Sequence, residues 1–266
     1  MLSRTPIVIL IMAMITYTSE AWGFRFTTDF TQGFYWGSLP VQMDVVATNP
    51  SDGNQLASLL SQAANAWESS TGSEIWQIRP GYSASTVTGN SIRWSNNFAA
   101  ETGYDPSVTL AVTIRYATGT YFSKTEIILN GQNSSLRSNS STLWKTILHE
   151  MGHTIGLDHS DTFAIMAPYV GSIDSIQSDD VSGMNSLIDQ TRYRQSTGYV
   201  SPISAGKEQN QSQFAACGSI GGLSGGSSGG GGSGSSNFIG SLLIGLLMFL
   251  TKKNRKKLPH HHHSFN

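Results

Sequence analysis

The most informative stretch of this chain is residues 149–159, His-Glu-Met-Gly-His-Thr-Ile-Gly-Leu-Asp-His. His149 and His153 are four positions apart, so on a helix both imidazoles point to one face and can share a metal ion. Glu150 lies one step round the helix, within reach of a metal-bound water. Gly156 can adopt a positive φ and end the helix, so the chain can turn back and offer His159 as a third ligand.

Three neutral nitrogen ligands with an open fourth position are typical of catalytic zinc rather than of a closed structural site. Five fixed residue types at these offsets would arise by chance in such a chain on the order of once in a hundred thousand. The alternative is a helix with surface histidines. The motif therefore predicts one catalytic Zn²⁺ held by His149, His153 and His159, with Glu150 as the general base for an attacking water.

Composition favours an exported protein without nucleic acid as a partner. Charged residues make up 12% of the 266 residues, about half the usual share of roughly 25%, and the formal net charge is -1. Cys217 is the one cysteine, so an intrachain disulfide is excluded and a metal site must use histidine or carboxylate ligands. The remaining histidines form a run at 260–263, to which we assign no function.

The N-terminus has the pattern of a secretory signal peptide. Arg4 is followed by the apolar run 7–15 and by Ala21-Trp22-Gly23, which predicts a signal peptide over 1–23 and cleavage before Phe24. A transmembrane anchor is the alternative, but the run is shorter than the roughly 20 helical residues that span a bilayer.

Residues 24–198 are expected to form one catalytic domain of the α+β class with a mixed sheet. Periodicity predicts the strands 40–47, 74–79, 91–94, 108–116 and 125–129. It also predicts a helix capped by Asp52 or Asn54 that runs through Trp67, a second helix from about Ser140, and a third over 178–188.

The 149–159 motif resembles the signature of metzincin zinc peptidases, and other segments resemble the matrixins in particular. Residues 164–168, Ala-Ile-Met-Ala-Pro, are similar to the Met-turn, which implies that Met166 lies beneath the metal. Residues 178–187 resemble the C-terminal matrixin helix, in which the equivalents of Asp179 and Asp180 tie the helix to the Met-turn and the mature N-terminus. The alternative is that both are helix N-terminal charges favoured by the dipole.

The resemblance implies a twisted five-stranded mixed sheet, two long helices, catalytic zinc in a cleft, and a short C-terminal subdomain with the Met-turn and a final helix. It also implies that Pro168 and Tyr169 line the primary specificity pocket and that substrate pairs with strand 108–116 as an added antiparallel strand. Asp158 and Asp161 are candidates for a Ca²⁺ site, with solvated loop carboxylates as the alternative.

This sequence also departs from the animal matrixins. No histidine precedes the motif, so their second, structural zinc cannot be built as they build it. No Pro-Arg-Cys-Gly-type segment precedes the domain, which argues against cysteine-switch latency.

After residue 198 the amino-acid composition of the chain changes. Residues 199–236 are a polar and then Gly/Ser-rich linker, 237–257 an apolar segment with a basic tail, and 258–266 a His-containing tail expected to be disordered. The apolar segment and its flanks resemble the GlyGly-CTERM sorting signal of Gram-negative bacteria, which implies delivery to the cell surface or medium after cleavage by a sorting protease. A simple tail anchor is the alternative.

Taken together, these features predict a monomeric, secreted or surface-attached zinc endopeptidase that acts on proteins or peptides. One alternative is a catalytically silent, zinc-containing surface module for binding or adhesion. Another is a zinc hydrolase that is not a peptidase, which the Met-turn disfavours.

Overall fold

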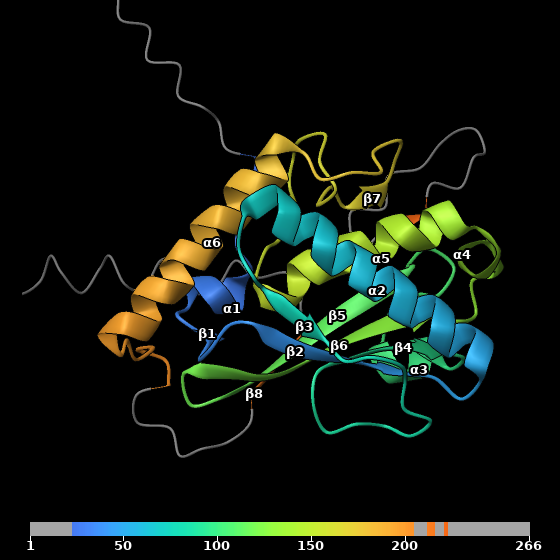
Figure 1. The fold of residues 1–266 in the computed structure, drawn as a ribbon, viewed down its shortest axis with the longest axis horizontal. Coiled ribbons are helices and arrows are strands. Elements are labelled where there is room, and N and C mark those ends of the chain that lie inside the picture. The colour runs from blue at the N-terminus through green and yellow to red at the C-terminus, as the bar shows by residue number, and fades with distance from the viewer. Residues whose placement is uncertain (1–22, 205–211, 216–220, 223–266) are drawn as a thin grey trace, which may run out of the picture. The chain divides into compact units, whose positions relative to one another are not determined.

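The computed structural model describes residues 23–204, 212–215 and 221–222 (Figure 1). The predicted signal peptide apart from Gly23, the apolar segment 237–257 and the tail 258–266 lie outside the described residues, as does Cys217. Most of the predicted linker 199–236 lies outside them as well.

A mixed β-sheet forms the centre of the domain, with strand order β3-β2-β4-β6-β5-β8. Its strands are β1 (Tyr35–Trp36), β2 (Val41–Val46), β3 (Trp76–Ile78), β4 (Ser91–Ser95), β5 (Ala111–Thr118), β6 (Tyr121–Asn130) and β8 (Ser212–Ala215). Strands β2, β3, β4 and β6 run parallel, and β5 is antiparallel to β6.

The five strands predicted from the sequence are all present, which confirms the α+β fold with a mixed sheet. Two further strands enlarge it: β1 pairs with the start of β6, and β8 pairs with the outer side of β5. Strand β6 begins at Tyr121, four residues earlier than predicted, because Gly119 (φ 61°) permits a tight turn directly after β5.

Three long helices and three short ones complete the domain. They are α1 (Thr28–Thr31), α2 (Pro50–Thr71), α3 (Phe98–Thr102), α4 (Ser134–Ser138), α5 (Ser140–Ile155) and α6 (Ser178–Thr197). The predicted cap of α2 was wrong. Asn49 caps that helix, because its side chain accepts a hydrogen bond from the Asp52 amide and Pro50 takes the first helical position.

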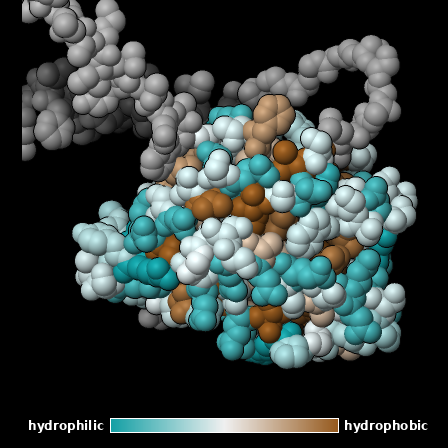
Figure 2. Space-filling view, turned by 45° about the horizontal axis from the view of Figure 1, so that its top comes forward, coloured by the Kyte–Doolittle hydropathy of each residue, from teal (hydrophilic) through white to brown (hydrophobic). Residues whose placement is uncertain are grey.

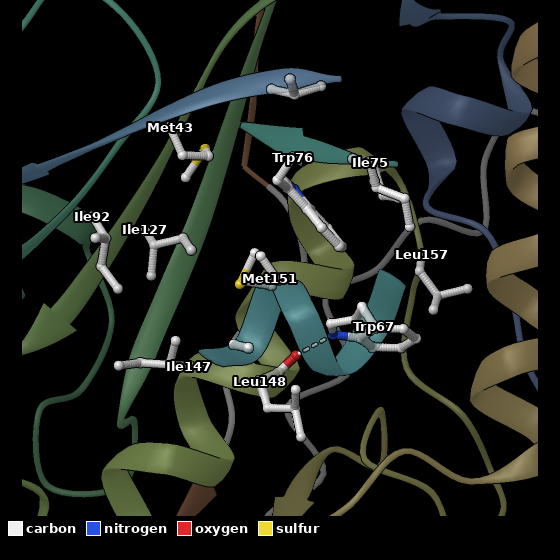
Figure 3. Close-up of a cluster of buried hydrophobic side chains, with 14 of the residues drawn as sticks. Met43, Trp67, Ile75, Trp76, Ile92, Ile127, Ile147, Leu148, Met151 and Leu157 are labelled. Atoms are coloured by element: carbon white, nitrogen blue, oxygen red, sulfur yellow. Dashed lines mark hydrogen bonds between the residues drawn. The ribbon is translucent and has the colours of Figure 1, made fainter. Parts of the chain in front are cut away.

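Helices α2 and α5 contact each other and pack against the sheet (Figure 1). Trp67 of α2 is fully buried between them, and its Nε1–H donates to the Leu148 carbonyl of α5 at 2.9 Å (Figure 3). Figure 3 also shows Ile147 and Met151 of α5 among apolar side chains of the sheet. Burying each such side chain stabilises the fold by about 1.5–3 kcal/mol, so α5 is held along its length.

Figure 2 shows apolar residues on one face as patches separated by polar ones. Within the residues that the structure describes, none of the helices combines the length and apolarity needed to cross a membrane.

Candidate metal centre

His149 and His153 lie in the last two turns of α5 and are completely buried. The helix ends at Gly156, whose φ of 118° is a left-handed conformation that favours glycine. A side chain there would also crowd Phe30, because an added Cβ would lie 3.1 Å from the Phe30 Cβ. The chain therefore leaves the helix at this residue and turns toward His159, as the sequence predicted.

The three histidines come together. Their ring centroids are 4.6 Å (His149–His153), 5.2 Å (His149–His159) and 5.0 Å (His153–His159) apart. One ligand nitrogen from each ring lies within 4.8 Å of the other two. This is the only group of metal-binding side chains found among the described residues.

Hydrogen bonds fix the tautomers of two rings. The Nδ1–H of His149 donates to the Ile165 carbonyl and that of His153 to the Leu157 carbonyl, both at 2.7 Å. In the neutral rings each Nε2 then carries a lone pair, and the two Nε2 atoms lie 2.9 Å apart. Two lone pairs at this distance repel each other unless a cation lies between them, so the arrangement fits a bound metal.

Burial keeps the rings neutral. It lowers the pKa of His149 to about 3, lowers that of His153 well below its ordinary value, and lowers that of His159. The His159 Nε2 is buried and has no hydrogen-bond partner. Neutral imidazole nitrogens without a competing proton are suitable ligands for zinc, so the three histidines fit a zinc ion.

Glu150 is also fully buried, next to the histidines. Its Oε2 accepts a hydrogen bond from the Thr113 hydroxyl of β5 at 2.5 Å, while Oε1 has no partner. Burial raises the pKa of Glu150 to about 8, although the Thr113 hydrogen bond and Arg115 favour the charged form. A dication held by the histidines would lower this pKa, because opposite charge favours the carboxylate.

A buried ion pair supports the far end of α5. The Arg115 guanidinium of β5 contacts the Asp29 carboxylate through two hydrogen bonds, of 2.7 and 3.0 Å, and both side chains are nearly inaccessible. Arg115 also donates to the His153 carbonyl. The pair thus joins the N-terminal segment, β5 and the helix that carries two of the histidines.

Met166 is buried and contacts α5 at Gly152. A Cβ at Gly152 would lie 2.5 Å from the Met166 Sδ, so the methionine approaches the helix backbone where a side chain is missing. The structure therefore places Met166 against the helix, between the two histidine positions.

The aspartate pair at the start of α6 ties three segments together, as the resemblance implied. Asp180 is buried and accepts hydrogen bonds from the Ile165 and Met166 amides at 2.9 and 3.0 Å. Asp179 accepts from the Gly23 and Phe24 amides at 3.0 and 3.2 Å. Both aspartates therefore bind backbone amides of other segments, so they are more than helix N-terminal charges favoured by the dipole.

A cavity of about 370 Å³ lies beside the metal centre. Tyr169 lines it, together with residues of the loop around it and Lys145 of α5, whose Nζ donates to the Gly171 carbonyl. Pro168 is not among the lining residues. Tyr169 is largely exposed, at 64% of its surface, and begins the short strand β7 (Tyr169–Val170).

The predicted Ca²⁺ candidates have other partners in the structure. Asp161 forms an exposed ion pair with Arg25, and Asp158 accepts a hydrogen bond from the His159 amide. Neither belongs to the metal-binding group found among the described residues.

Sequence reasoning missed Thr113 and the Arg115–Asp29 pair. A signal was present in Arg115, the one charged residue in the apolar run 108–116, because a charge on a buried strand requires a partner. Its partner, Asp29, is 86 residues away and carries no motif of its own.

Comparison with protein-family models gives a match to the peptidase family model described as Matrixin, over residues 43–189. The matched region runs from within β2 into α6, so it includes β3, β4, β5 and β6, the helices α2 and α5, and all three histidines. A comparison with curated proteins found no match.

Proposed function

Because the chain belongs to the matrixin family, we propose that it is an exported endopeptidase in which His149, His153 and His159 hold the zinc and Glu150 is the general base. Matrixins are zinc-dependent peptidases, and the chain is accordingly a zinc metallopeptidase that acts on peptides. The observation that carries the residue assignment is the convergence of three neutral imidazoles beside a buried carboxylate with one unpartnered oxygen.

Zinc bound there would act as a Lewis acid that makes water nucleophilic near neutral pH and polarises the scissile carbonyl. Glu150 Oε1 would accept a proton from the attacking water and later deliver it to the leaving nitrogen. Thr113 supports this role because its hydroxyl donates to Oε2, while Oε1 has no hydrogen-bond partner. Thr113 is thus a positioning residue.

The substrate would lie in an extended conformation along β5, with a side chain in the cavity lined by Tyr169. Main-chain hydrogen bonds to β5 would supply sequence-independent affinity, and the cavity would supply preference for one side chain. This assignment of β5 and of the cavity belongs to the proposal.

We further propose that the protein is exported by a Gram-negative bacterium and acts as a monomer outside the cell or on its surface. The sequence pattern of 1–23 supports export, and the apolar segment 237–257 supports transient or lasting membrane attachment. N-terminal sequencing and intact mass of the mature extracellular protein would test both: retention of residues 1–23 or an uncut C-terminus would contradict cleavage.

The catalytic assignment is tested with a mixed peptide library, with and without chelator, beside the Glu150→Gln variant. We expect cleavage by the zinc-loaded protein, loss of cleavage with chelator, and an inactive variant that still holds one zinc per chain. A Glu150→Gln variant with full turnover would refute the role of Glu150. Bound zinc without any cleavage by the unsubstituted protein would favour the silent binding module.

A further inference from the structure

The cavity beside the metal centre carries one charge that its own lining does not balance. The charged residues of the lining are Lys145 and Asp161. Asp161 forms an ion pair with Arg25, so its charge is compensated. Most of the remaining lining is apolar and comes from the chain between α5 and α6, namely Phe163, Ala164, Ile165, Ala167, Val170 and Ile173.

Lys145 has no comparable partner. Among the described residues, none of the ion pairs includes it. Its Nζ donates one hydrogen bond, of 2.8 Å, to the Gly171 carbonyl, and Gly171 also lines the cavity. A lysine ammonium group has three N–H donors, so this bond leaves donors for a further acceptor.

The helix places Lys145 next to the metal ligands. Lys145 precedes His149 by four positions in α5, so the two residues share one helix face and are separated by one turn, about 5.4 Å along the axis. Ile165 connects the two sites, because it lines the cavity while its carbonyl accepts from the His149 ring. A side chain that enters the cavity from a peptide bound at the metal would therefore meet Lys145.

The hydrogen bond to Gly171 limits where the ammonium group can go. Strand β7 ends at Val170, directly before Gly171, and it pairs with β9 (Gly221–Gly222). This pairing holds the backbone that carries the acceptor carbonyl. The ammonium group is thus kept at the cavity wall by a partner that has no formal charge.

The chemistry of this wall favours an anionic occupant. An apolar side chain would remove water from the ammonium group without offering an acceptor, which is unfavourable for a charged group. A carboxylate would accept a charge-assisted hydrogen bond from Nζ, and the methylene groups of glutamate would contact the apolar walls. We propose that Lys145 makes the cavity select an acidic side chain, glutamate above all, in the peptide substrates of this protein. This inference rests on the proposed function, since it assigns a substrate class to the same site.

The test begins with the zinc-loaded full chain and a mixed peptide library whose cleavage sites are read by mass spectrometry. We expect glutamate to be enriched at one position beside the scissile bond. Peptides that differ only at that position, with glutamate or its isostere glutamine, then isolate the effect of charge. The glutamate peptide should be cleaved with about tenfold higher kcat/KM.

Two variants of Lys145 and one matched control identify the source of this preference. Lys145→Met removes the charge from a side chain of similar length and should abolish the difference between the two peptides. Lys145→Glu reverses the charge and should favour a lysine peptide over the glutamate peptide. Lys124→Met removes the same charge from β6, outside the cavity lining, and should keep the native ratio. Because each ratio is measured within one protein sample, a smaller folded or zinc-loaded fraction cancels.

The outcomes separate this inference from the proposed function. A native preference for leucine or methionine over glutamate at that position would overturn it, and so would a glutamate preference that survives in Lys145→Met. If no form cleaves any peptide, the proposed function fails, and the library is instead enriched on immobilised zinc-loaded protein. Enrichment of acidic peptides that disappears in Lys145→Met then supports the inference, whereas equal recovery of the glutamate and glutamine peptides overturns it.

Discussion

Replacing Gly152 by alanine introduces two opposing physical effects near the C-terminal end of α5. The residue lies inside the helix, where alanine is favoured over glycine by about 1 kcal/mol. In this fold, however, the new Cβ would lie 2.5 Å from the Met166 Sδ and 3.1 Å from its Cε. Met166 is 1% exposed and Trp67 closes the other side at 3.4 Å, so neither can move away freely.

The overpacking should outweigh the gain in helix propensity. Overpacking a well-packed core costs about 1–3 kcal/mol, and a contact this short belongs in the upper half of that range. After subtraction of about 1 kcal/mol for propensity, Gly152→Ala should lower the free energy of unfolding by about 1–2 kcal/mol. For a domain of this size that corresponds to a decrease in Tm of roughly 2–8 °C.

Chemical denaturation of the metal-free protein measures this change without the contribution of bound zinc. A double-mutant cycle with Met166→Ala gives the control, since that substitution removes the atoms that clash. We expect the double variant to be more stable than the sum of the single effects by about 2–3 kcal/mol. A Gly152→Ala variant more stable than the native chain, or strictly additive effects, would refute the packing argument.

Two further predictions concern charge in the buried site. Burial lowers the pKa of His149 to about 3 and that of His153 well below its ordinary value, so the metal-free fold loses the stability contributed by the neutral rings as the pH falls from 7.5 to 5. The raised pKa of Glu150 acts in the opposite direction and adds about 3 kcal/mol over the same interval. Acidification should therefore destabilise metal-free Glu150→Gln by about 3 kcal/mol more than the native chain; urea titrations at both pH values that show equal losses would contradict this. Asp180→Ala should cost about 3 kcal/mol or more, because three backbone amides lose their buried acceptor, whereas exposed Asp189→Ala on the same helix should stay within about 0.5 kcal/mol. Equal unfolding midpoints for these two variants would show that Asp180 does not hold the Met-turn.

Much of the metal centre could be predicted from the sequence, because its candidate ligands lie within one short stretch of the chain. His149 and His153 share a helix face through their four-residue spacing, and Gly156 permits the turn that returns His159. The cap of α2 was assigned to the wrong residue because Asn49, Asp52 and Asn54 all have capping side chains, and only the path of the chain distinguishes them.

Sequence alone determined which residues can bind metal, the order of strands and helices, and the α+β class, because these depend on spacing and periodicity along a short stretch. Tertiary structure alone decided the contacts between distant segments. It brought Asp29 to Arg115 and Gly152 to Met166, and it paired residues 212–215 with β5. None of these pairings follows from a local sequence pattern. Each depends on which strand edge, cavity or buried charge remains unsatisfied after the core has packed.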